Sequence, residues 1–108
     1  MDSWDLPSLA VEPHRPQVLR SDDEVRVIVI NLPAGEALRE HRVHERTYLF
    51  VADGEIEIEG DGSVESGGTG YLAHFDAGED HEVRAKTDTR LLMLLAPWPG
   101  EGHPSYRT

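Results

Sequence analysis

Hydrophobic and polar residues alternate in several short segments of the chain, with the period of a β-strand that buries one face. The clearest case is residues 55–59, where Ile56 and Ile58 are predicted to face inward while three glutamates face water. Residues 81–86 alternate in the same way, so His81 is predicted to share an inward face with Val83 and Ala85. Both segments are therefore predicted to be half-buried strands.

Further strands are indicated by β-branched and apolar runs that end in turn residues. These predicted strands are residues 25–30, 48–52, 64–65, 71–75 and 90–95. Residues 90–95 are apolar on both faces, so they need cover from the barrel interior and from either the N-terminal segment or another subunit. Asp53-Gly54 is a strong hairpin signal. Short strands at this spacing, without helical periodicity, predict an all-β antiparallel barrel or sandwich.

Composition narrows the function classes. The 108 residues fit one domain with room for a single core and one small pocket. The formal net charge of −11 repels phosphates and anionic lipid, so neither nucleic acid nor a membrane is an expected partner. The chain has no cysteine, which excludes disulfides, thiolate metal sites and a cysteine nucleophile.

The expected compartment is the cytoplasm. The first residues lack the basic region and the apolar run of a signal peptide. The longest apolar run, residues 91–97, is too short to span a bilayer. A soluble protein is the simplest prediction from these features.

Glycines and histidines recur in two groups at suggestive spacing. The first group reads GEALREHRVHERT and contains Gly35, His41 and His44; it is followed by the strand that ends at Gly54. The second group reads GYLAHFDAGEDH and ends at His81. This pattern resembles the two motifs of the cupin superfamily, in particular its small single-domain members.

The resemblance implies a fold and a division of the chain. The fold would be a small antiparallel β-barrel, the jelly-roll-like double-stranded β-helix of cupins, over residues 25–95. Residues 1–24 would pack on the barrel as a peripheral segment, and residues 96–108 would form a C-terminal tail. Homodimerisation is also expected, because an open barrel of this size has exposed sheet edges.

The resemblance also implies a divalent metal site, of which His41 and His81 occupy ligand positions. The family's second histidine would stand at position 43, but this chain has Val43 followed by His44. His44 can join the site only if a bulge or turn intervenes, because residues three apart on a strand face opposite sides. Thr47 stands in the place of the family's glutamate, and threonine is a poor ligand for a divalent ion.

Other residues could line the pocket or its rim. The face of His74 depends on the register of the turn before His81, and Tyr48 and Tyr71 could contact a ligand or a histidine. Glu45 could replace the missing carboxylate only if its loop were reshaped. Three arginines flank the histidines and form either a solvated rim or a contact for an anionic substrate: Arg39, Arg42 and Arg46.

The expected function is a barrel that binds a divalent metal (Mn, Fe, Ni, Cu or Zn) and a small-molecule ligand. It could be a metalloenzyme, with oxygenation, isomerisation and lyase chemistry all precedented in the family. It could instead be a metal-free binding or sensor module, to which the loss of a carboxylate at Thr47 gives weight. A scaffold that keeps only the fold is a third reading. The sequence does not decide whether the protein is an enzyme.

Overall fold

The structure is a computed structural model that describes residues 1–40, 45–60 and 62–96. This part of the chain contains a short 3-10 helix and nine β-strands. In chain order they are η1 (Leu6–Ser8), β1 (Gln17–Ser21), β2 (Arg26–Leu32), β3 (Ala37–Glu40), β4 (Arg46–Asp53), β5 (Glu55–Gly60), β6 (Ser63–Gly68), β7 (Leu72–Phe75), β8 (His81–Ala85) and β9 (Thr89–Ala96).

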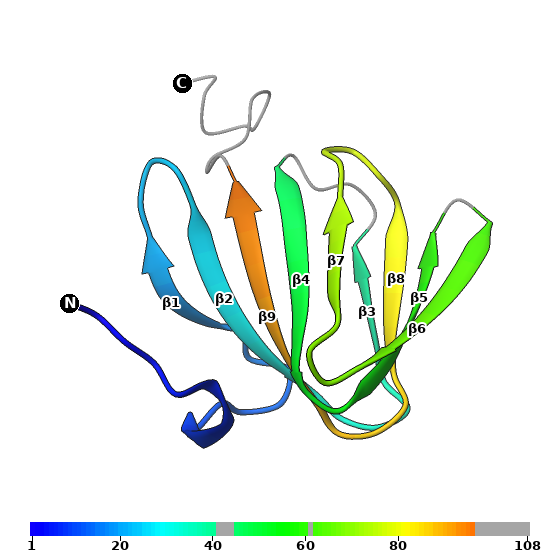
Figure 1. Cartoon of the computed structure of the whole chain (residues 1–108), viewed down its shortest axis with the longest axis horizontal. Helices are drawn as coiled ribbons and strands as arrows, with labels where there is room; N and C mark the ends of the chain where they lie inside the picture. Colours follow the sequence, from blue (N-terminus) through cyan, green and yellow to red (C-terminus); the bar gives the residue numbers. More distant parts are fainter. Residues whose placement is uncertain (41–44, 61, 97–108) are drawn as a thin grey trace.

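The strands form two sheets that face each other. One sheet has the order β1-β2-β9-β4-β7 and the other has the order β3-β8-β5-β6. The paired strands are antiparallel in both sheets. Figure 1 shows the two sheets side by side, with their strands running between an upper and a lower end. The prediction of an all-β antiparallel barrel is therefore confirmed.

The core lies between the inner faces of the two sheets. Ile56 and Ile58 of β5 are buried while the flanking glutamates reach solvent, as their alternation predicts. His81, Val83 and Ala85 of β8 are buried together, which confirms their shared inward face. These residues pack with apolar side chains from β2, β4, β7 and β9 into one hydrophobic cluster.

Strand β9 is covered on its inner face and only partly covered on its outer face. Alternate residues from Thr89 to Leu95 are buried, whereas Arg90, Leu92 and Leu94 are half-buried on the other side. The N-terminal segment covers one end of this outer face, because the Arg90 guanidinium donates a hydrogen bond to the Leu6 carbonyl. The interior and the N-terminal segment thus supply part of the double cover that this strand needs.

The prediction of a hairpin at Asp53-Gly54 is wrong. Strands β4 and β5 flank this dipeptide, yet they belong to different sheets and do not pair. The dipeptide therefore forms a corner at which the chain crosses between sheets, not a hairpin. Two strands, β1 and β3, were also absent from the prediction, because neither has a run of alternating apolar residues.

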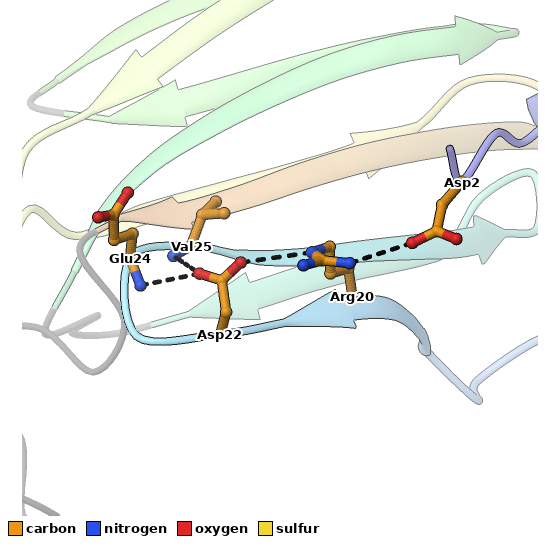
Figure 2. Close-up of polar contacts among 5 residues, drawn as sticks. All are labelled: Asp2, Arg20, Asp22, Glu24 and Val25. Carbon is orange, nitrogen blue, oxygen red and sulfur yellow. Dashed lines mark hydrogen bonds and ion pairs between the residues drawn. The ribbon is translucent and has the colours of Figure 1, made fainter.

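The turn between β1 and β2 is fixed by one aspartate (Figure 2). The Asp22 carboxylate accepts hydrogen bonds from the backbone N–H groups of Glu24 and Val25. These bonds, together with the Arg20 guanidinium, hold the pKa of Asp22 below its usual value. Arg20 also forms an ion pair with Asp2, so the turn and the N-terminus share one network. The network fixes the chain just before β2 begins.

Candidate functional site

Of the three predicted metal ligands, His81 is the one that lies within the described residues. Its side chain is buried, with 5% of the residue exposed, and stacks on Phe75 at 3.8 Å with an interplanar angle of 5°. Its Nδ1 lies 3.3 Å from the Glu79 carbonyl oxygen. A carbonyl oxygen can only accept, so this contact is a hydrogen bond when Nδ1 carries the proton. The other nitrogen, Nε2, then keeps its lone pair in the neutral ring.

Four residues form a row across the inner face of the five-stranded sheet. Leu95 of β9 pairs with Arg26 on one side and with Thr47 on the other, and Thr47 in turn pairs with Phe75. The row lies at the upper end of the barrel in Figure 1, where β2 and β4 begin and β7 and β9 end. His81 begins β8 at the same end and stacks on Phe75 across the two sheets. We call this end the barrel mouth.

Thr47, which the sequence predicts to stand in place of the family's carboxylate, is fully buried, with 0% of the residue exposed. Its Oγ1 has no hydrogen-bond partner within the described residues. A buried hydroxyl without a partner costs free energy because water no longer solvates it. This orphaned hydroxyl therefore points to a ligand group that would meet it in the mouth.

Glu45 is a second polar side chain buried in this region, with 3% of the residue exposed. It stands two residues before Thr47, in the bend that precedes β4. In the sequence, this buried carboxylate stands two positions before the one at which the family resemblance predicts a carboxylate.

Tyr48 and His74 lie on the outer face of the sheet and not among the mouth residues. They pair across β4 and β7, and their rings approach to 4.8 Å. Both are exposed, whereas their neighbours Thr47 and Phe75 are buried. Strand parity explains the result, because each of them is one residue away from an inward-facing neighbour. The structure therefore separates Tyr48 and His74 from His81.

Tyr71 contacts Glu65 of β6, at the edge of the four-stranded sheet. Its hydroxyl donates a hydrogen bond of 2.7 Å to a Glu65 carboxylate oxygen, which raises the pKa of Tyr71. Its ring packs directly over Gly67, where even a methyl group would lie 2.2 Å from the ring. The hydroxyl is thus engaged away from the barrel mouth.

His41 and His44 lie outside the described residues, so the metal-ligand prediction for them stays a prediction. Within the described ranges, no group of three or more histidines, cysteines or carboxylates could hold a metal ion. Within the described residues, the fit to a divalent metal therefore depends on His81, whose Nε2 can bind a metal when the ring proton is on Nδ1. Thr47 does not fit as a ligand.

Arg26 was missed in the sequence prediction. It begins β2 and shares its parity with Ile28 and Ile30, which belong to or pack on the core. Its Nε atom is fully buried. The sequence contained a signal for it. Residues two apart on a strand share a face, so Arg26 is predicted to face inward with Ile28 and Ile30.

A cavity of about 420 Å³ opens at the other end of the barrel, beneath the N-terminal segment. Its walls include Pro7, Pro33, Asp88 and Arg90. Two of its charged groups have partners, since Asp88 accepts from the Ala34 N–H and Arg90 donates to the Leu6 carbonyl. The mouth, with its orphaned Thr47 hydroxyl, is therefore the better candidate site.

Comparison with known families and structures agrees with this geometry. The family model described as a cupin domain matches residues 28–97. This chain belongs to the cupin superfamily. An RmlC-like cupin from Desulfovibrio desulfuricans is 26% identical with a TM-score of 0.79, and the match covers 90% of this chain and 97% of that one. The cupin match spans both histidine motifs, so it confirms the resemblance on which the predicted fold rested.

Two other cupin structures share the fold at lower identity. A cupin superfamily protein from Desulfitobacterium hafniense has a TM-score of 0.76 at 17% identity, covering 89% of this chain and 93% of that one. An RmlC-like cupin with a double-stranded β-helix fold from Methanocaldococcus jannaschii has a TM-score of 0.71 at 18% identity, covering 78% and 80%. No curated protein matches the chain. In the described ranges, no helix is long and apolar enough to cross a membrane.

Proposed function

We propose that this cupin binds a divalent transition metal and a small organic molecule together in the barrel mouth. His81 would be one metal ligand, and His41 and His44 would supply the others from the segment between β3 and β4. The observation that carries the proposal is the placement of His81, which is buried and stacks on Phe75, with its Nδ1 3.3 Å from the Glu79 carbonyl oxygen. In the tautomer that donates from Nδ1 to this carbonyl, Nε2 keeps the lone pair that a metal ligand needs.

The bound metal (Mn, Fe, Ni, Cu or Zn) would act as a Lewis acid toward an oxygen of the small molecule. The chain's own residues bind and orient that molecule. Thr47 provides a neutral donor in place of the family's carboxylate, and Phe75 holds the His81 ring in place. A metal-free binding module is the second candidate, and the uncharged Thr47 favours it.

A His81→Ala variant tests the metal site. Metal content is measured by elemental analysis on tag-free protein, for the native chain and for the variant. We expect about one metal ion per chain in the native protein and a loss of tenfold or more in the variant, because removal of one of three ligands weakens the site strongly.

A His74→Ala variant is the matched control, because His74 lies on the outer face and should not change the metal content. Native protein with far less than one metal ion per chain, and no thermal shift on addition of Mn, Ni or Zn, would contradict the metal site and leave the metal-free module.

We also propose that a second copy of this chain covers the outer face of the five-stranded sheet. Apolar side chains gather there from β4, β7 and β9, namely Tyr48, Phe50, Leu72, Leu92 and Leu94. Tyr48 is 39% exposed and Leu72 is 61% exposed, so these apolar side chains are open to solvent in the single chain. Burial of apolar surface against a second copy would stabilise the contact. This self-complementary contact suits a two-fold dimer.

If two chains pair through this face, one charged substitution on it should separate the dimer into single chains. Sedimentation velocity of the native chain should give the mass of two chains, and Leu72→Glu should give the mass of one, because burying a carboxylate against a second copy is costly. Val64→Glu is the control, since Val64 is 56% exposed on β6 of the other sheet and should leave the dimer intact. A native chain that sediments as a monomer would disprove the contact.

A further inference from the structure

We propose that the small molecule bound in the barrel mouth is an organic anion, whose carboxylate is held by Arg26 and by the hydroxyl of Thr47. This inference rests on the proposed function in one respect, because it uses the same mouth. It goes further in naming the chemical class of the ligand and the two residues that recognise it.

Arg26 supplies the charge. Its parity with Ile28 and Ile30 directs it into the barrel, and its Nε atom is fully buried. A guanidinium that is partly removed from water interacts strongly with a carboxylate, and its planar donors match the two carboxylate oxygens. An inward-facing arginine next to Leu95 at the barrel mouth is therefore suited to select an anion.

Thr47 supplies a second donor at the right place. Arg26 and Thr47 lie on strands that flank β9, so their Cα atoms are separated by two strand spacings, or about 10 Å. The arginine side chain is long enough to reach over Leu95 toward the Thr47 hydroxyl. A carboxylate between them would accept a hydrogen bond from each, and it would satisfy the Oγ1 that has no partner in the described residues.

The surroundings of these two donors suit the rest of the ligand. Leu95 and Phe75 flank Thr47 in the same row and belong to the hydrophobic core, so the neighbours of Thr47 are apolar and suit a hydrocarbon or aromatic group. Glu45, two residues before Thr47, is also buried, and its negative charge disfavours an anion bound nearby. Binding of an anion therefore depends on the positive charge of Arg26, and removal of the Glu45 charge should strengthen it.

The test uses benzoate as the probe and benzamide as its neutral counterpart. Both are titrated into ¹⁵N-labelled full-length protein treated with a chelator, so that no metal contributes to binding. We expect benzoate to shift the backbone amides of Arg26, Thr47 and His81 with a measurable Kd, and benzamide to bind at least tenfold more weakly. Arg26→Gln and Thr47→Val should each raise the benzoate Kd about tenfold, as the loss of a hydrogen bond to a charged group predicts.

Two further variants make the test specific. Arg46→Gln is the matched control, because Arg46 is exposed and adjacent to Thr47 but faces outward, and its benzoate Kd should not change. Glu45→Gln should lower the Kd. If Arg26→Gln does not fold, Thr47→Val still tests the proposal, since it removes only the hydroxyl.

Three results would each overturn the inference: no benzoate binding by the native protein, equal binding of benzamide, or a benzoate Kd that Thr47→Val leaves unchanged. None of them bears on the metal, which elemental analysis of the native and His81→Ala proteins measures separately. Failure of the anion site and failure of the metal site are therefore distinguishable.

Discussion

Gly54→Ala is expected to lower the free energy of unfolding by about 3–5 kcal/mol, which is among the larger effects of a single substitution. Gly54 has φ of +111°, a backbone conformation that side chains rarely allow. A methyl group there would lie 2.5 Å from Thr89 Oγ1 and 2.7 Å from the backbone oxygen of Asp88. Backbone cannot move aside as a flexible side chain can, so the corner between the sheets must distort.

Urea unfolding followed by circular dichroism measures this loss. Gly62→Ala is the matched control, because Gly62 also has a positive φ of +78° but its added methyl group would meet no atom of the described residues within 4 Å. Gly62→Ala should lower the free energy of unfolding by only about 1 kcal/mol, because only the unfavourable backbone conformation contributes. Equal losses in the two variants would contradict the role of the close contact with Asp88 and Thr89.

The behaviour of Gly54 also shows where prediction from sequence stops. Asp53-Gly54 has the composition of a hairpin turn, and a hairpin and a corner need the same positive φ from glycine. What distinguishes them is the partner of the next strand. β5 pairs with β6 and β8 in the other sheet, and these contacts involve residues far away in the sequence. Local turn chemistry cannot specify such a choice.

Strands with one buried face were predictable because burial imposes an alternation that the sequence displays. β5 and β8 are examples, with their apolar residues in the core and their charged residues outside. β1 and β3 lack this signal. Their backbones extend because β2 and β8 offer hydrogen bonds to them, and tertiary pairing of this kind overrides weak local preference.

The candidate site was predictable only in part. His81 was expected on an inward face, and the structure places it there. The row that joins Arg26 to Thr47 depends on the register of β2 and β4 against β9, which the sequence does not display. Register decides which residues face each other, so long-range pairing creates this part of the mouth.

Thr47→Val is expected to raise the free energy of unfolding of the ligand-free protein by about 1–2 kcal/mol, because it removes a buried hydroxyl that has no partner in the described residues. Valine has nearly the same shape, so the core should not need to repack. For a domain of this size the change corresponds to an increase in Tm of roughly 4–8 °C per kcal/mol. Thermal unfolding followed by calorimetry, with chelator and without added anions, measures it.

Thr89→Val is the control, because the same substitution at Thr89 should change the stability in the opposite direction. Thr89 is also buried, but its hydroxyl lies 3.1 Å from the Glu55 carbonyl and 2.9 Å from the Thr87 carbonyl, to which it can donate. The same substitution should therefore destabilise the protein by about 1–2 kcal/mol at Thr89 and stabilise it at Thr47. A loss of stability at both positions would mean that the Thr47 hydroxyl has a structural partner. A gain at Thr47, together with weaker benzoate binding, would show that the hydroxyl serves the ligand at the expense of the fold.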